Sequence, residues 1–197
     1  MDLISVTLLT GFLGSGKSTL LTQILRKPSF GDIAVVVNEF GEVGLDGFLV
    51  EHADDQIIEM TSGCLCCTIR GDIRKTLLAL CDRRDKGEVP AFRRIVIEST
   101  GLADPAPVMH TLMSDPSLER RYMLGGVVAT IDSINGAATL DYHPECVKQA
   151  AVADRLVITK TDLIEPSIVE VELAQLKAKL RTFNSSARIV ERHDPAF

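Results

Sequence analysis

Residues 11–18 form a glycine-rich motif that strongly constrains the fold of this chain. They read Gly-Phe-Leu-Gly-Ser-Gly-Lys-Ser and match the pattern G-x-x-x-x-G-K-[ST]. An apolar run typical of a strand precedes the motif, and apolar residues at helical spacing follow it. In this context the glycines let successive backbone N–H groups turn towards one anion, to which the following helix presents its positive end. The motif therefore predicts a phosphate-binding loop with a nucleoside triphosphate as its ligand.

The residues that we expect to bind the nucleotide through this loop are consecutive: Gly14, Ser15, Gly16, Lys17, Ser18 and Thr19. Lys17 can reach the β- and γ-phosphates, and Ser18 can ligate Mg²⁺. From average composition, a chance match in a chain of this length is of the order of one in a hundred, and the strand and helix patterns on either side lower it further.

Short apolar runs rich in β-branched residues alternate with helical patterns along the chain. They predict strands at 4–9, 33–37, 94–97, 126–131 and 155–159, with a short extra strand at 57–60 and a last edge strand at 187–190. Helical spacing predicts helices over 73–81 and 169–180, the second with Pro166 in its first turn. We therefore predict an α/β fold of the P-loop NTPase type, three layers deep, with a mainly parallel sheet covered by helices on both faces.

Composition limits the class of protein. The chain has 197 residues, 46% of them hydrophobic, and a net charge of -6 with scattered basic pairs, so we expect one globular domain and neither nucleic acid nor a membrane as partner. The longest uncharged stretch, 3–16, is shorter than the roughly 20 residues that span a bilayer. Five cysteines favour reduced thiols or metal ligands in the cytoplasm. Cys81, on an apolar helix face, and the isolated Cys146 are predicted to be structural.

A buried-strand pattern, Arg-Ile-Val-Ile, ends in the carboxylate of Glu98. In P-loop proteins this is the place of the acid that organises Mg²⁺, so we assign Glu98 to the magnesium site together with Ser18. Ser-Thr-Gly follows and completes an E-x-x-G sequence, in which the N–H of Gly101 would sense the γ-phosphate. Lys17, Ser18, Glu98 and Gly101 are therefore the candidate catalytic residues. Leu102 stands where many signalling GTPases carry a water-orienting glutamine, which predicts slow intrinsic hydrolysis.

Residues 159–162 follow another buried-strand pattern and read Thr-Lys-Thr-Asp. This sequence resembles the N-K-x-D guanine-reading motif of GTPases. Asp162 can accept hydrogen bonds from guanine N1–H and the 2-amino group, whereas adenine does not offer these donors in that arrangement, and the stem of Lys160 can cover the base. GTP is therefore favoured over ATP. Thr159 in place of asparagine is expected to weaken the bracing of the loop while leaving the base-reading carboxylate intact.

Three thiols fall within four residues at Cys64, Cys66 and Cys67. In an extended backbone the first two project to one side and the third to the other, so two thiolates can converge. Thiolates suit Zn²⁺ and other borderline divalent ions, and Glu39 or Glu42, an imidazole or water could complete the ligand set. Buried small hydrophobes and a redox pair are the alternative interpretations of this motif.

Taken together, these motifs resemble the CobW family of P-loop GTPases over nearly the whole chain. The resemblance lies in the stretches 10–18, 38–42, 63–67, 98–105 and 159–162, of which the cysteine motif and the Glu-Ser-Thr-Gly-Leu-Ala-Asp-Pro sequence are most specific. It implies metal-handling GTPases, among them proposed zinc metallochaperones and proteins tied to cobalamin synthesis or metalloenzyme activation. It also implies that the Cys-x-Cys-Cys motif binds metal and that GTP and metal are coupled.

The chain departs from the family pattern in two respects. Some relatives carry a metal-binding glutamate directly before the Asn-Glu-Phe-Gly-Glu stretch, where this chain has Val37. The family also continues into a smaller C-terminal domain, so we expect 1–197 to be the GTPase domain, with that C-terminal domain absent from this chain.

The resemblance and the motifs lead to one functional hypothesis. GTP and Mg²⁺ would order 38–47 and 100–104, so that Glu39 or Glu42 and the thiols of Cys64 and Cys66 form a site for Zn²⁺ or Co²⁺, and hydrolysis to GDP would loosen it. The metal would pass to a client metalloenzyme or metal-insertion partner. A homodimer that forms with nucleotide or metal is a further possibility. The alternatives are a P-loop ATPase or kinase with structural thiols, and a non-catalytic, nucleotide-bound metal-sensing module.

Overall fold

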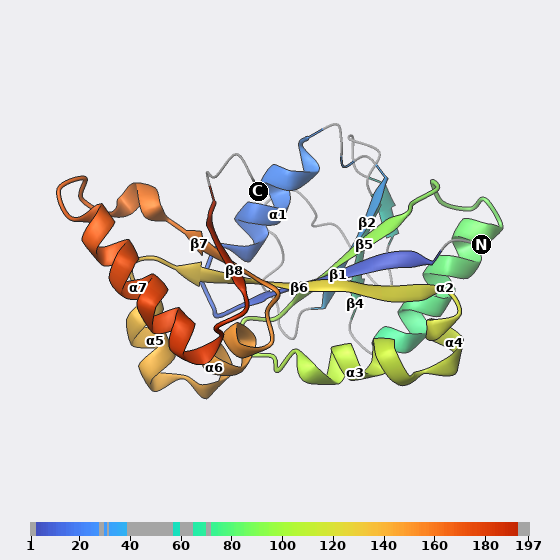
Figure 1. Ribbon diagram of the computed structural model, residues 1–197. Helices are drawn as coiled ribbons and strands as arrows, with labels where there is room; N and C mark the ends of the chain where they lie inside the picture. Colours follow the sequence, from blue (N-terminus) through green and yellow to red (C-terminus); the bar gives the residue numbers. More distant parts are fainter. Residues whose placement is uncertain are drawn as a thin grey trace.

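The computed structural model describes residues 3–27, 30, 32–38, 57–59, 65–69 and 72–192, in which strands and helices alternate (Figure 1). The strands are β1 (Ile4–Gly11), β2 (Ile33–Asn38), β3 (Ile57–Glu59), β4 (Leu65–Ile69), β5 (Arg94–Ser99), β6 (Tyr122–Asp132), β7 (Arg155–Thr159) and β8 (Arg188–Glu191). The helices are α1 (Lys17–Leu25), α2 (Ile73–Asp85), α3 (Ala106–Ser114), α4 (Pro116–Glu119), α5 (Gly136–Tyr142), α6 (Pro144–Ala151) and α7 (Val169–Phe183), with a short 3₁₀ helix, η2 (Thr161–Leu163). None of the described helices is long and apolar enough to cross a membrane.

These strands form one sheet in the order β3-β4-β2-β5-β1-β6-β7-β8. Every neighbouring pair runs parallel except β3 against β4, which confirms the mainly parallel sheet. β1 lies in the middle, between β5 and β6. Ligands of open parallel sheets bind at the carboxyl ends of the strands, so the segments that follow β1, β5, β6 and β7 are the ones expected to form a site.

The side chains of the central strands alternate between two cores. Leu8 of β1 and Val36 of β2 belong to the larger core, which helices α2 to α7 cover, whereas Leu9 and Val35 belong to the smaller core beneath α1. Figure 1 shows α1 on one side of the sheet and α3, α4, α5 and α6 on the other. The three-layer arrangement predicted from the sequence is confirmed.

Three details differ from the sequence-based expectation. Residues 65–69 form a strand inside the sheet, although the sequence analysis treated this region only as a cysteine cluster. β6 begins at Tyr122, upstream of the expected residue 126, because Gly125 and Gly126 are accommodated by a register shift against β1 and do not end the strand. Pro166 lies in a turn before α7 and not in its first helical turn, since proline suits both positions.

Candidate functional site

The P-loop joins the end of β1 to the start of α1. Gly16, the N-cap of α1, has φ 89°, a left-handed conformation that favours glycine, and its cap makes no side-chain hydrogen bond to the first-turn N–H groups. These N–H groups are the donors that a helix N-terminus offers to phosphate. Lys17 Nζ donates to the carbonyl oxygens of Gly11 at 2.9 Å and Phe12 at 3.2 Å. The lysine therefore folds back over its own loop.

Buried hydroxyls tie this loop to the neighbouring strands. Ser15 Oγ and Thr130 Oγ1 of β6 share a hydrogen bond of 2.6 Å, and Thr159 Oγ1 of β7 donates to the carbonyl oxygen of Ser15 at 2.7 Å. All three residues are buried. Thr159 therefore contacts the P-loop directly, and the weakening expected relative to asparagine stays a prediction. Thr130 is a residue that the sequence analysis missed, because a threonine within a strand has no pattern that marks it as a contact of the P-loop.

Ser18 in the first turn of α1 contacts Glu98 of β5, the strand beside β1. Glu98, near the end of β5, lies in register with Leu9 of β1 and is only 5% exposed. Ser18 Oγ donates to Glu98 Oε1 at 2.7 Å. The structure thus brings together the two residues assigned to magnesium from the sequence. A hydroxyl and a carboxylate are hard oxygen donors of the kind that Mg²⁺ prefers, so this donor set fits the ion.

The E-x-x-G segment passes close against the P-loop. A Cβ atom on Gly101 would lie 2.6 Å from the backbone nitrogen of Leu13, so only glycine fits there. Ser99 Oγ donates to Thr10 Oγ1 at 3.0 Å, which ties the start of the segment to β1. Leu102, in the place of the catalytic glutamine of other GTPases, is 55% exposed. The backbone of Gly101 is therefore beside the loop in which we expect the phosphates.

The T-K-x-D motif follows β7 and is anchored by a buried acid. Lys160 has φ 59°, a conformation that costs a non-glycine residue of the order of 1–3 kcal/mol. Its Nζ donates to Asp132 Oδ2 at 2.8 Å, and Asp132 also accepts from the backbone N–H groups of Ile134 and Asn135. Asp162 lies exposed in η2. The sequence analysis missed Asp132, although an acid at the carboxyl end of a buried strand is the same signal that identified Glu98.

Hydrogen bonds outweigh burial at Asp132. Burial by itself raises the pKa of this carboxyl, but the hydrogen bonds from Lys160, from the side chain of Asn135 and from the two backbone N–H groups together hold its pKa below the ordinary value. The ionised form is therefore stabilised in the folded protein, where it balances the charge of Lys160.

A cavity of about 240 Å³ adjoins the P-loop. It lies between Phe12, Ile131, the first turn of α5 and Cys146 of α6.

Burial raises the pKa of the Cys146 thiol to about 11, so at neutral pH it stays protonated and unreactive. Cys81 is buried in the core as well. Both cysteines therefore fit the structural role predicted for them.

The predicted transition-metal ligands lie largely outside the described residues. Glu39, Glu42 and Cys64 are not described, and of Cys66 and Cys67 the structure describes only the backbone, in β4. Within the described parts of the chain, no group of three or more His, Cys, Asp or Glu side chains could hold a metal ion. Val37, where some relatives have a metal-binding glutamate, is a buried core residue beneath α1.

Comparison with known proteins identifies the family. Residues 5–191 match the model of the CobW/HypB/UreG nucleotide-binding domain. The chain belongs to this family. The zinc chaperone YjiA of Escherichia coli K12 is 42% identical over 180 residues, which cover 91% of this chain and 56% of that protein. The zinc-regulated GTPase metalloprotein activator 1 of Schizosaccharomyces pombe is 34% identical over 198 residues, 97% of this chain and 46% of that protein. The chain thus spans about half the length of these relatives.

Solved structures of CobW/HypB/UreG proteins agree with this fold. The crystal structure of Zn(II)-bound YjiA GTPase from E. coli matches with a TM-score of 0.78 and 40% identity, over 96% of this chain and 57% of that one. HypB from Helicobacter pylori in complex with nickel matches with a TM-score of 0.61 and 19% identity, over 98% and 81% of the two chains. This second likeness shows the fold alone. The predicted family and its P-loop fold are confirmed.

Replacing Thr159 by valine tests the brace beneath the P-loop. The Thr159→Val change keeps the shape but removes the donor to the Ser15 carbonyl, so we expect a loss of about 1–3 kcal/mol in the free energy of unfolding, measured by urea titration. The matched control is Thr182→Val, whose exposed hydroxyl also donates to a carbonyl. That change should cost less than about 0.5 kcal/mol. Equal effects of the two changes would contradict the brace.

Replacing Asp132 by asparagine tests how the charge of this carboxylate contributes to stability at different pH values. Because the folded pKa is lowered, the stabilisation from Asp132 is fully present above the ordinary value of about 3.9 and is lost as the pH falls through the folded pKa. Asp132→Asn should therefore lower the free energy of unfolding by about 1–3 kcal/mol at pH 7, and this difference should shrink below about pH 4. Urea titrations at several pH values measure it. A difference that stays constant down to pH 3 would contradict the prediction.

Proposed function

We propose that this chain binds GTP, hydrolyses it slowly, and couples the nucleotide state to the binding and delivery of a divalent transition metal, zinc foremost. The observation that carries the proposal is the 2.7 Å contact between Ser18 and Glu98, since it joins the P-loop to the E-x-x-G segment at the carboxyl edge of the sheet. Membership of the CobW/HypB/UreG family and the names of the zinc-handling relatives support the metal function.

The chain's own residues account for the phosphate chemistry. The N–H groups of the P-loop and Lys17 bind the phosphates, while Ser18 and Glu98 would hold Mg²⁺, which supplies positive charge that offsets the charge on the β- and γ-oxygens. Water adds to the γ-phosphorus as the bond to the β,γ-bridging oxygen breaks, giving GDP, inorganic phosphate and a proton. The Gly101 N–H faces the γ-phosphate. Leu102 cannot orient the attacking water as glutamine does, so turnover is slow.

Base recognition rests on the segment after β7. Lys160 and Asp162 form the guanine site: Asp162 accepts from guanine N1–H and the 2-amino group, and the stem of Lys160 covers the ring. Two contacts support this role. The Lys160 side chain is oriented by Asp132, and Thr159, directly before it, is fixed to the P-loop. The base site and the phosphate site are therefore held at a set distance from one another.

Strand order supports the coupling of metal to nucleotide. β2 lies between β4, which carries Cys66 and Cys67, and β5, which carries Glu98. Val37 of β2 is in register with Thr68 on one side and with Glu98 on the other. Two strand spacings, about 10 Å, therefore separate the backbone of Glu98 from that of Thr68, the residue directly after the cysteine motif. Over this distance an ordered segment following β2 could contact both sites.

We also propose the ligands and the recipient of the metal. Cys64, Cys66 and Cys67, with Glu39 or Glu42 from the segment after β2, hold the ion when GTP is bound, and the metal passes to a client metalloenzyme or metal-insertion partner. Zn²⁺ is the first choice because thiolates suit it, and Co²⁺ is the second.

Nucleotide selectivity is tested by titrating the chain with GTP and with ATP. The wild type should prefer GTP, and Asp162→Asn should lower GTP affinity about 100-fold, because an amide cannot accept from both guanine donors as the carboxylate does. The control is Asp141→Asn, an exposed acid on α5 that should leave both affinities unchanged. Equal affinity of the wild type for the two nucleotides would favour the ATPase or kinase alternative.

Coupling is tested by metal competition on one sample with GDP and with a non-hydrolysable GTP analogue. Zn²⁺ should bind about 100-fold more tightly with the analogue, which corresponds to about 2.7 kcal/mol of differential binding. Cys66→Ser should lower Zn²⁺ affinity in both nucleotide states. Cys81→Ser, at a buried thiol of α2, should leave Zn²⁺ affinity unchanged. Equal zinc affinity in the two nucleotide states would remove the coupling.

A further inference from the structure

Gln149 of α6 is a buried polar side chain that the proposed chemistry does not yet use. It is 1% exposed, and its Nε2 donates to the carbonyl oxygens of Gly101 at 3.1 Å and Ala103 at 3.0 Å. Gly101 ends the E-x-x-G segment, and Ala103 lies two residues beyond it. One amide group thus holds the two backbone positions on either side of Leu102.

The held segment is a tight turn. The backbone N–H of Ala103 donates to the carbonyl oxygen of Thr100 at 3.1 Å, and Gly101 lies against Leu13 of the P-loop with no room for a side chain. Without the amide of Gln149, the carbonyl of Gly101 would lose a buried hydrogen bond and that of Ala103 a partly buried one. The turn would then relax, and the orientation of the Gly101 peptide would change with it.

α6 provides a fixed base for this contact. Cys146 and Ala150 of α6 are buried in the larger core, and the ring of His143, the N-cap of α6, makes a tilted contact with that of Phe12 in the P-loop, with centroids 4.4 Å apart. The same short helix therefore contacts the P-loop at one end and the E-x-x-G segment near the other. Core packing fixes the position of α6, so the hydrogen bonds from Gln149 fix the position of the turn relative to the core.

We propose that Gln149 is a positioning residue for GTP: its side-chain amide sets the 101–103 turn so that the Gly101 N–H meets the γ-phosphate. The inference rests on the proposed function, in which Gly101 senses that phosphate. It assigns to α6 the discrimination between GTP and GDP, since only GTP offers the group that the turn is set to meet.

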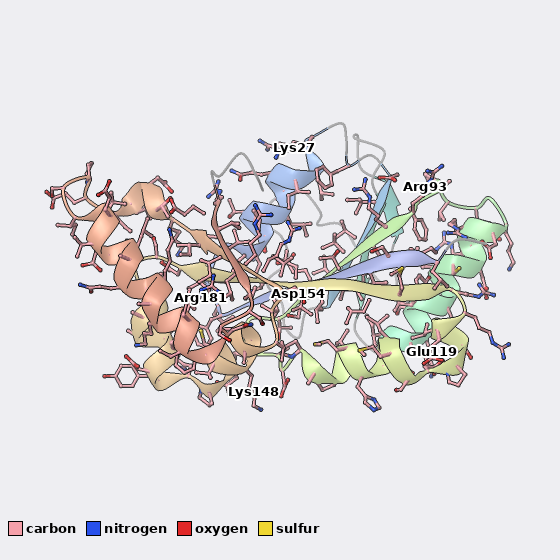
Figure 2. All side chains as sticks on the ribbon, viewed as in Figure 1. Lys27, Arg93, Glu119, Lys148, Asp154 and Arg181 are labelled. Atoms are coloured by element: carbon pink, nitrogen blue, oxygen red, sulfur yellow. The ribbon has the colours of Figure 1, made fainter. Side chains whose placement is uncertain are left out.

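Lys148, the neighbour of Gln149 on α6, provides a matched control. Figure 2 labels Lys148 on α6, and its Nζ forms an exposed ion pair of 3.0 Å with Asp104 of the same segment. Exposed pairs contribute little, and Asp104 keeps its second hydrogen bond, from the Ala106 N–H. A change at Lys148 therefore disturbs the same helix and the same segment without touching the turn carbonyls.

The test compares binding of a fluorescent non-hydrolysable GTP analogue and of fluorescent GDP, together with single-turnover GTP hydrolysis, in the full chain. In Gln149→Met, analogue affinity and the hydrolysis rate should each fall about tenfold, while GDP affinity changes less than about twofold. Gln149→Asn, which keeps the amide but is one methylene shorter, should show a smaller loss in the same two quantities. Lys148→Met should match the wild type in all three.

Circular dichroism checks that each variant is folded, and if Gln149→Met does not fold, Gln149→Asn carries the comparison. Equal losses for the analogue and for GDP would reduce Gln149 to a structural role and overturn the inference. Wild-type behaviour of folded Gln149 variants would overturn it as well. These two results count against the inference only when the wild-type protein binds and hydrolyses GTP. If the wild-type protein does neither, the proposed function itself is overturned.

Discussion

The P-loop keeps its place because buried hydroxyls join it to the strands beside it. Ser15 shares a hydrogen bond with Thr130 of β6, and Thr159 of β7 donates to the backbone of Ser15. These bonds are made in the interior, where an unpaired donor or acceptor is costly, so the loop and the strands must fit one another. The strands in turn carry Asp132, which accepts a hydrogen bond from Lys160 of the T-K-x-D segment. The P-loop and the T-K-x-D segment are consequently parts of one hydrogen-bonded edge.

Parallel strand order converts distant sequence motifs into neighbours. Ser18 and Glu98 are 80 positions apart, yet the pairing of β1 with β5 brings their side chains into contact. The same order sets β4, with its cysteines, one strand beyond β2. Helices cover both faces, so the carboxyl edge is where loops can meet a ligand, and this is where the P-loop, the E-x-x-G segment and the T-K-x-D segment gather. On the larger-core side, α6 adds a contact from Gln149 to the segment after β5.

Much of the fold and part of the site could be predicted from residue patterns. The strand at 155–159 was predicted with its observed bounds, because a short β-branched run with clear flanks carries its own signal. β4 was missed because the cysteines of the run Leu-Cys-Cys-Thr-Ile were interpreted as ligands, and because its pairing with β2 joins segments that lie about 30 residues apart in the chain. Thr130 and Gln149 were missed for a similar reason: a single polar residue within a strand or helix has no periodicity to distinguish it. Asp132 differs, because it ends a buried strand as Glu98 nearly does, and this signal was overlooked.

By itself, the sequence determined the motifs that this protein carries: a glycine-rich loop, an acid near the end of a buried strand, a T-K-x-D motif and a cluster of thiols. Short motifs can be identified from the sequence alone because their function depends on local backbone geometry and side-chain type. Only the tertiary structure decided which of these residues are in contact and what holds them in place. The Ser18–Glu98 contact and the hydrogen bonds from Gln149 to Gly101 and Ala103 are examples. The reason is physical: such contacts depend on strand order and helix packing, which act between residues far apart in the chain.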